Sequence, residues 1–272
     1  MSTVMPSLIY GTAWKKEHTQ ELVVAAVKTG FRAIDTACQP KDYNEAGVGK
    51  ALQALEKEGF RREDLFLQTK FTPLGGQDPL SVPYDKKAEL STQVAQSFEV
   101  SKINLRTDYL DSLVLHSPLS PFSDLERVWQ AMEKIAQRGE VKQLGISNIY
   151  DLHTLQELYE VATIKPSVVQ NRFYQDSGYD KEIRSFCKTH NIIYQSFWTL
   201  TANPHILQST ELLELSQKYK KNVIQLFFAY LHQIGITPLT GTTDTEHMQS
   251  DLQSFDITLE EGEVLRLDSL FE

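Results

Sequence analysis

Phe31-Arg-Ala-Ile-Asp35 is the first of three apolar runs in this chain that end on a chemically competent side chain. The second is Leu65-Phe-Leu-Gln-Thr-Lys70, and the third is Leu113-Val-Leu-His116. Packing of a hydrophobic core does not explain a lysine at the end of an apolar run, because burying an unpaired ammonium is costly. In a barrel of alternating strands and helices, such residues lie at the C-terminal rim, where the active sites of that fold are built. The pattern therefore indicates a site assembled from separate strands.

Eight short strand candidates follow one another along the chain, and helical periodicity follows each of them. The strands are expected near residues 7–10, 32–35, 65–69, 110–115, 142–146, 166–170, 191–196 and 235–238. The helices are expected near 18–29, 44–57, 88–104, 124–138, 151–162, 180–189, 207–232 (as two helices) and 244–252. Ser123 with Glu126 predicts a capping box for one of these helices, and Thr258 with Glu261 predicts another for a final helix beyond the eighth unit.

This alternation predicts an α/β fold, a (β/α)8 TIM barrel formed as a single domain over residues 1–272, with an extra C-terminal helix. An open, doubly wound sheet is the competing architecture. It is disfavoured because no G-x-G-x-x-G follows the first strand, and the pair Gly47 and Gly49 is followed by Leu52 where a third glycine would be needed. The Gly- and Pro-containing stretch 72–84 is expected to form a long loop on the functional rim.

Composition excludes several classes of function. A net charge of −9 without a dense Lys/Arg run argues against nucleic acid as a partner. The two cysteines, Cys38 and Cys187, form neither a disulfide framework nor a metal pair, and the seven histidines show no metal-ligand spacing, so no metal site is predicted. No signal peptide is recognisable, and the longest apolar stretch, near 223–234, is too short to cross a bilayer. We therefore expect a cytoplasmic protein without a membrane partner.

Several segments in this order resemble the aldo-keto reductases over essentially the whole chain. The resemblance is carried by Gly30-Phe-Arg-Ala-Ile-Asp-Thr-Ala37, Tyr43-Asn-Glu-Ala-Gly-Val-Gly49, Phe66-Leu-Gln-Thr-Lys70, Tyr109-Leu-Asp-Ser-Leu-Val-Leu-His116, Leu144-Gly-Ile-Ser-Asn148 and Pro166-Ser-Val-Val-Gln170. It implies an NAD(P)H-dependent oxidoreductase that reduces aldehydes or activated ketones to alcohols by hydride transfer. The expected partner is thus a small-molecule carbonyl compound, and we expect a monomer or a weak dimer.

The catalytic tetrad of that family maps onto Asp35, Tyr43, Lys70 and His116. Carbonyl reduction requires a proton on oxygen, and a free tyrosine, with a pKa of about 10, is a poor acid-base group at neutral pH. A lysine ammonium is expected to draw the phenol pKa down, a carboxylate to hold the lysine charged, and His116 to orient the carbonyl. One departure is that Tyr43 follows Asp35 by eight residues, because Cys38-Gln-Pro-Lys-Asp42 lengthens the loop between them.

The resemblance also implies a nicotinamide site at Ser147, Asn148 and Gln170, whose hydroxyl and amide groups suit a carboxamide. Phe197 is expected to stack on the nicotinamide. The remaining cofactor surface is expected to include Thr12, Asp35, Trp198, Thr240, Thr243, His247 and Asp251. The Lys and Arg that commonly grip the 2′-phosphate of NADP in relatives are missing after the eighth strand, and the arginine position is His247. NADPH is the expected cofactor, with NADH as the alternative.

The substrate pocket is expected to be lined by Trp14, Phe71 and Trp198 beside Tyr43 and His116, with Phe173 and Tyr174 as further candidates. The chain ends soon after its last helix, which predicts an open, tolerant pocket. Two other functions remain open at this point. One is an enzyme in which Lys70 forms a Schiff base, and the other is a barrel that binds a nucleotide without turnover.

Overall fold

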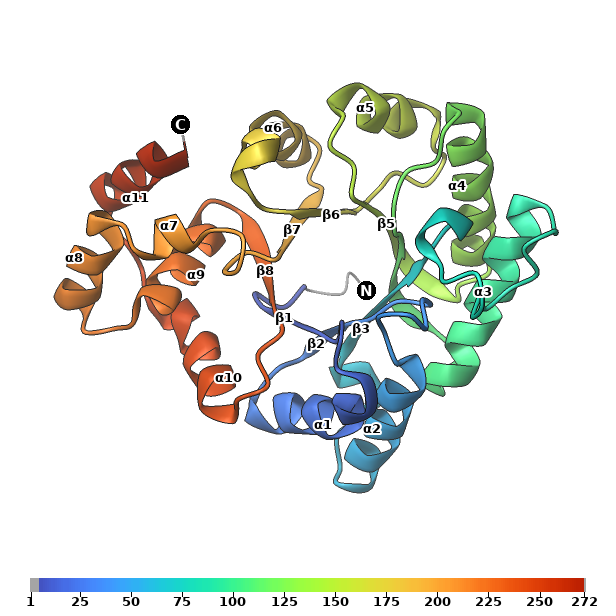
Figure 1. Ribbon diagram of the computed structural model, residues 1–272, viewed down its shortest axis with the longest axis horizontal. Helices are drawn as coiled ribbons and strands as arrows, with labels where there is room; N and C mark the ends of the chain where they lie inside the picture. Colours follow the sequence, from blue (N-terminus) through green and yellow to red (C-terminus); the bar gives the residue numbers. More distant parts are fainter. Residues whose placement is uncertain (1–4, 272) are drawn as a thin grey trace.

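A computed structural model describes residues 5–271 of the chain. Eight parallel strands form a closed barrel in chain order, and β1 pairs with both β2 and β8 (Figure 1). The strands are β1 (Ile9–Gly11), β2 (Ala33–Asp35), β3 (Phe66–Phe71), β4 (Leu110–Leu115), β5 (Val141–Ser147), β6 (Val168–Arg172), β7 (Ile193–Phe197) and β8 (Ile236–Thr240). The predicted (β/α)8 barrel is confirmed, and every predicted strand overlaps the strand observed.

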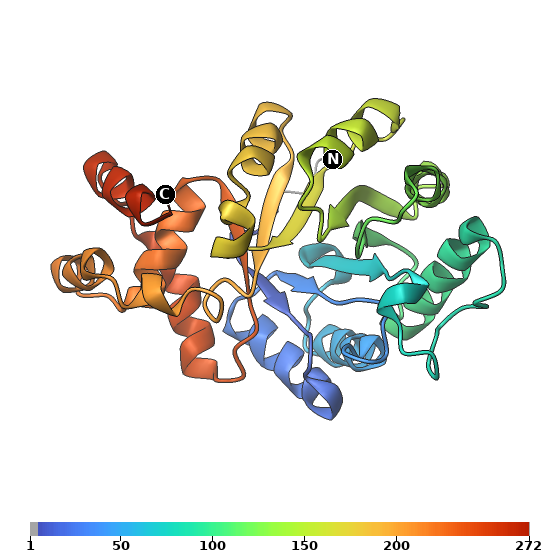
Figure 2. The same cartoon turned by 45° about the horizontal axis from the view of Figure 1, so that its top comes forward.

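The helices form a ring around the barrel, with α8, α9 and α11 side by side (Figures 1 and 2). They are α1 (Thr19–Thr29), α2 (Glu45–Lys57), α3 (Leu90–Leu105), α4 (Phe122–Gln137), α5 (Leu152–Val161), α6 (Lys181–Thr189), α7 (Pro204–Leu207), α8 (Thr210–Tyr219), α9 (Val223–Gln233), α10 (Thr245–Leu252) and α11 (Glu261–Asp268). The stretch 207–232 contains α8 and α9 as separate helices, and the extra C-terminal helix is α11. No helix among the described residues is long and apolar enough to cross a membrane.

Both predicted capping boxes are wrong in position. Helix α4 begins at Phe122, after Pro121, so Ser123 lies inside its first turn and caps nothing. The C-terminal capping box is formed by Glu260 and Glu263 instead of Thr258 and Glu261. A carboxylate can accept the same backbone N–H bonds as a hydroxyl, and the negative charge suits the N-terminal end of the helix dipole.

The period-two alternation of the strands decides which side chains enter the barrel. Ala33 and Asp35 share one face of β2, and Phe66, Gln68 and Lys70 share one face of β3. Ile9, Ala33 and Phe66 form a small apolar cluster separate from the main core, which packs helices against strands. On β2 and β3 the side chains further towards the C-terminal ends of the strands are polar. The barrel interior therefore changes from apolar to polar along its axis.

Candidate active site

Side chains from the C-terminal ends of several strands surround a cavity of about 1040 Å³. Most of the residues predicted for catalysis, cofactor binding and the substrate pocket line it: Trp14, Asp35, Tyr43, His116, Ser147, Asn148, Gln170, Phe197, Trp198, Thr240, His247 and Asp251. Asp35, Ser147, Phe197 and Thr240 are the last residues of β2, β5, β7 and β8, and His116 directly follows β4. This is the rim at which catalytic residues gather in this fold.

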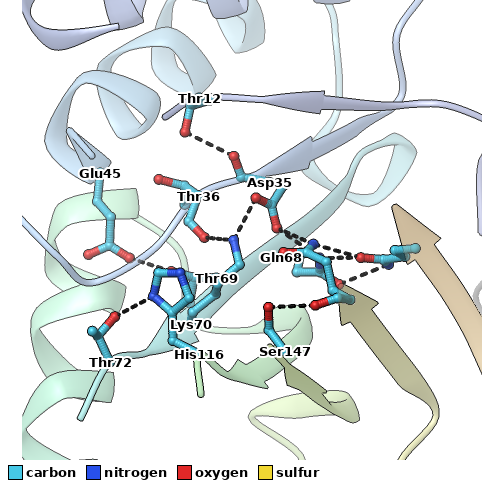
Figure 3. A network of polar contacts seen from close by, with 12 residues as sticks. Thr12, Asp35, Thr36, Glu45, Gln68, Thr69, Lys70, Thr72, His116 and Ser147 are labelled. Carbon is cyan, nitrogen blue, oxygen red and sulfur yellow. Dashed lines mark hydrogen bonds and ion pairs between the residues drawn. The ribbon is translucent and has the colours of Figure 1, made fainter. Parts of the chain in front are cut away.

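Lys70 and Asp35 form a buried ion pair beneath the cavity (Figure 3). Lys70 Nζ lies 2.5 Å from Asp35 Oδ2 and donates to the carbonyl of Thr36 at 2.9 Å. The side chains of both charged residues are at most 3% exposed. Burial lowers the pKa of Lys70, and the Asp35 carboxylate opposes that shift. Lys70 is thus paired with the carboxylate that the sequence analysis expected beside it, and it does not itself line the cavity.

Three glutamines complete the surroundings of Asp35. Gln68 and Gln170 donate from Nε2 to Asp35 Oδ1 at 2.8 and 3.1 Å, and both also donate to Gln195 Oε1 at 2.8 Å. The carboxylate thus accepts two amide N–H groups besides the ammonium, and hydrogen bonds to the charged form stabilise it. The sequence analysis did not identify Gln68 and Gln195 as site residues. Each is an amide within a buried strand, and a buried amide almost always has a hydrogen-bond partner. That combination was the signal in the sequence.

Tyr43 lies in the loop before α2 and faces the cavity. Its ring meets the imidazole of His116 edge-on, with ring centres 5.9 Å apart, and Lys70 Nζ lies 5.2 Å from the centre of the phenol ring. Burial raises the pKa of Tyr43, and the nearby carboxylates of Asp35 and Asp42 raise it further. The expected lowering of this pKa by Lys70 is therefore wrong: the lysine charge is matched by Asp35. The raised pKa keeps Tyr43 a protonated phenol at neutral pH, so its hydroxyl is a hydrogen-bond donor at the cavity.

His116 is held from both its backbone and its ring. Its N–H donates to the carbonyl of Phe71 at 2.9 Å, and its Nδ1 lies 2.7 Å from Thr72 Oγ1. Burial, together with the nearby Lys70 ammonium, lowers the pKa of His116 to about 3. The imidazole is consequently neutral over the whole physiological range and able to act as a hydrogen-bonding group rather than as a charge.

Ser147, Asn148 and Gln170 present mixed donors and acceptors at one end of the cavity. Ser147 Oγ donates to the carbonyl of Gln170 at 2.6 Å, and Asn148 Nδ2 donates to the carbonyl of His116 at 2.8 Å. Within residues 5–271, no side chain or backbone N–H donates to Gln170 Oε1. A cavity-facing acceptor beside a hydroxyl and a second amide fits the carboxamide of a nicotinamide.

The other end of the cavity, between α10 and the loop after β1, carries hydroxyl groups and two basic side chains. Thr240 Oγ1 donates to Asp251 Oδ2 at 2.9 Å, and His247 lies one helical turn before Asp251. Lys15, which the sequence analysis missed, donates to the carbonyl of Gly241. Its signal was its place in the loop that follows the first strand, on the functional rim. A cation and hydroxyl groups fit a sugar phosphate.

Besides Lys70, five predicted residues lie outside the cavity lining. Phe71 is buried against Tyr84, and Phe173 is buried against Tyr179 and Phe271, because both point into the helix–strand core. Thr12 is fully buried and donates to the carbonyl of Asp35 at 2.9 Å, so it supports that residue from behind. The other two are Tyr174, whose ring packs on the Arg172 guanidinium, and Thr243, which is exposed.

The lining residues Trp14, Asn148 and Trp198 all adopt left-handed backbone conformations, with φ of 60°, 55° and 55°. Such residues are uncommon outside glycine and gather at functional sites. Trp14 is 56% exposed and Trp198 is 43% exposed, and their rings lie 5.8 Å apart at the cavity mouth. The sequence signalled neither the backbone conformation nor this pairing, because the two residues are far apart along the chain.

A phenol, a neutral imidazole and a buried Lys–Asp pair beside a carboxamide-binding surface define a nicotinamide-dependent oxidoreductase built on a TIM barrel. Comparison with known proteins agrees. The model of the Aldo/keto reductase family matches residues 7–272. The chain therefore belongs to the aldo/keto reductase family, and it is an NADPH-dependent oxidoreductase that reduces carbonyl groups.

Two relatives and one solved structure illustrate the similarity. Glyoxal reductase of Bacillus subtilis is 30% identical over 251 residues, covering 92% of this chain and 82% of that protein. NADPH-dependent alpha-keto amide reductase of Saccharomyces cerevisiae is 30% identical over 279 residues, with the same two coverages. The crystal structure of MGS-M4, an aldo-keto reductase from a Medee basin deep-sea metagenome library, superposes with a TM-score of 0.82 at 25% identity, covering 98% of this chain and 92% of that chain.

Proposed function

We propose that this chain reduces aldehydes and activated ketones with Tyr43 as the proton donor. The observation that carries the proposal is the position of the Tyr43 phenol, whose ring centre lies 5.9 Å from that of His116 and 5.2 Å from Nζ of the paired Lys70. The cofactor, when bound, supplies a hydride to the carbonyl carbon. His116 binds the carbonyl oxygen and orients it, and Tyr43 donates its proton to that oxygen. The phenolate that remains lies beside the Lys70–Asp35 pair, with Lys70 Nζ 5.2 Å from the centre of its ring.

The substrate class follows from the cavity mouth and from the relatives. Trp14 and Trp198 leave the mouth open, which suits tolerance for substrates of different shapes. The names of the two relatives, glyoxal reductase and alpha-keto amide reductase, both describe a carbonyl activated by a neighbouring carbonyl. We therefore expect dicarbonyl compounds and keto amides to be better substrates than simple ketones.

Cofactor discrimination is expected to be weaker than in relatives that grip the 2′-phosphate of NADP with Lys and Arg. Lys15 and His247 are the basic residues at the end of the cavity between α10 and the loop after β1, and Lys15 donates to a backbone carbonyl. We therefore expect NADH to serve as a second cofactor. Asp251 and Thr240 are proposed to contact the cofactor near His247, as is Trp198 at the cavity mouth. We further propose that the protein acts in the cytoplasm, as one domain over residues 1–272 and as a monomer or weak dimer.

Initial rates with NADPH and NADH against aldehydes, dicarbonyls and simple ketones test this proposal. We expect the highest kcat/KM for dicarbonyls, and a smaller NADPH-to-NADH ratio than the factor of about 10³ that a full phosphate clamp of roughly 4 kcal/mol would give. Binding of NADPH without turnover of any carbonyl would instead identify a nucleotide-binding barrel. Covalent trapping of a carbonyl on Lys70 by borohydride would identify a Schiff-base enzyme.

A further inference from the structure

Thr72 contacts the catalytic imidazole from the side opposite the cavity. Its Oγ1 lies 2.7 Å from His116 Nδ1 (Figure 3). Thr72 is 2% exposed and does not line the cavity, whereas His116 does. Nδ1 is thus engaged with the protein, and Nε2 is the ring nitrogen left to meet a substrate. Thr72 is the first residue after β3, two positions after Lys70.

The backbone of Thr72 is fixed independently of His116. Its carbonyl accepts from Tyr84 Oη at 2.8 Å and from Gln77 Nε2 at 3.1 Å. Both donors belong to the loop 72–84, which folds back on its own first residue. In the described part of the chain, Thr72 Oγ1 has no hydrogen-bond partner other than His116. The hydroxyl is therefore held in place, and its proton is not claimed by another acceptor.

The direction of this hydrogen bond decides what Nε2 can do. A neutral imidazole carries one N–H, so one ring nitrogen donates and the other accepts. If Nδ1 carried the proton, Nε2 would present a lone pair to the lone pairs of a substrate carbonyl. If the Thr72 hydroxyl donates to Nδ1, the proton resides on Nε2 and points towards the cavity. The hydrogen bond made by one ring nitrogen thereby sets the chemistry of the other.

We propose that Thr72 is a positioning residue that fixes the tautomer of His116: its hydroxyl donates to Nδ1, and Nε2–H is thereby presented to the substrate carbonyl. This inference rests on the proposed role of His116 in binding the carbonyl oxygen. It assigns a function to the start of the loop 72–84, which the sequence placed on the functional rim without a specific role.

The tautomer is measurable in the wild-type protein by NMR of ¹⁵N-labelled histidine side chains, without any turnover. The His116→Asn variant identifies the resonances of His116 by their loss. We expect two-bond ¹H–¹⁵N correlations typical of the Nε2–H tautomer. A His116 ring protonated on Nδ1 would overturn the proposal, whatever substrates the enzyme uses. Because this measurement needs neither turnover nor a Thr72 variant, it remains decisive if such a variant fails to fold.

Kinetics of Thr72→Val and Thr72→Ser provide the second test. Val keeps the shape of Thr72 without the hydroxyl, so we expect kcat for aldehyde reduction to fall by about tenfold, the value of one neutral hydrogen bond. Ser restores the hydroxyl and is expected to recover most of that loss. Thr29→Val is the matched control, because it removes a hydroxyl that bonds to the carbonyl of Ala25 on α1, outside the site.

The Val variant is expected to bind NADPH as tightly as wild type and to lose the uniform Nε2–H signature of His116. Unchanged kcat in Thr72→Val, or an unchanged tautomer in that variant, would overturn the proposal. A wild-type protein that reduces no carbonyl would contradict the proposed function instead, and the tautomer measurement would still report on Thr72. The two failures are thus distinguishable.

Discussion

At the scale of single residues, the site depends on how charge is distributed among a few buried side chains. The Lys70 ammonium is paired with Asp35, and the neutral groups Tyr43 and His116 face the cavity. Burial favours the neutral form of both side chains, because it disfavours the phenolate of Tyr43 and the imidazolium of His116. In the proposed reaction, the proton donor and the group that orients the carbonyl are therefore both uncharged at the start.

Tyr43→Phe is predicted to abolish most carbonyl reduction while preserving the fold and the cofactor site. Loss of a general acid typically costs about 10²–10⁴-fold in rate. The measurement is single-turnover reduction of an aldehyde by preloaded enzyme, with the NADPH Kd and the circular dichroism spectrum as controls. Turnover near the wild-type value would mean that another group donates the proton.

The pH dependence of kcat follows from the same two residues. The pKa of His116 lies at about 3, so this imidazole stays neutral as pH rises from 5, and the raised pKa of Tyr43 keeps the phenol protonated well above neutrality. With cofactor and substrate saturating, we predict a flat kcat from about pH 5 to pH 9 where chemistry limits the rate. A step near the ordinary histidine pKa of about 6.5 that disappears in His116→Asn would contradict a neutral His116.

At the scale of the element, strand ends were predictable and the partners of rim residues were not. The apolar runs correctly predicted that Asp35, Lys70 and His116 lie at the C-terminal ends of strands, because the length and position of a strand depend mainly on its own residues. Lys15 bonds a carbonyl in the β8 loop, and Gln68 bonds Gln195 on β7, so these roles appear only once the barrel has closed. Helix starts were misplaced where proline or glutamate replaced the expected cap.

Helix α10 gives a prediction about cofactor affinity. Burial raises the pKa of Asp251 to about 6, against the neighbouring hydrogen bond from Thr240, which lowers it. As pH rises through about 6, this carboxyl becomes an anion at the end of the cavity where the cofactor phosphate is proposed to bind. We therefore expect NADPH binding in wild type to weaken relative to Asp251→Asn between about pH 5 and pH 7.

The measurement compares NADPH Kd for wild type and Asp251→Asn at each pH, by quenching of tryptophan fluorescence. Because the 2′-phosphate also titrates near pH 6, the informative quantity is the ratio between the two proteins, with NADH as a ligand that lacks this phosphate. A constant ratio across the range would show that the Asp251 charge does not reach the cofactor.

At the scale of the whole molecule, the two ends of the barrel carry separate tasks. Asp111 lies near the start of β4, at the end opposite the cavity, and is 1% exposed. It accepts from the backbone N–H of Leu67 at 2.9 Å and pairs with Lys142 at 2.7 Å and Arg62 at 3.0 Å. Residues at this face of a TIM barrel serve stability, whereas those at the opposite rim serve chemistry.

Asp111→Ala is accordingly predicted to lower stability and to leave kcat/KM unchanged. The variant orphans a buried backbone N–H, which alone costs about 2 kcal/mol. Urea unfolding of the variant checks the loss, with Asp64→Ala, at an exposed pair with Arg61, as a control that should change little. A fall in kcat/KM for Asp111→Ala under fully folding conditions would show that the two ends of the barrel are coupled.

The amide network around Asp35 also affects when activity is expected to return during refolding. Its members come from β2, β3, β6 and β7, so the first half of the chain contributes Asp35 and Gln68, and the second half contributes Gln170 and Gln195. A chain in which only the first half has folded lacks the amides of Gln170 and Gln195 around Asp35. During refolding from urea, enzymatic activity should return only with the slowest phase, after helical circular dichroism has largely recovered. An early species with native helix content and full activity would show that the second half of the chain is dispensable for catalysis.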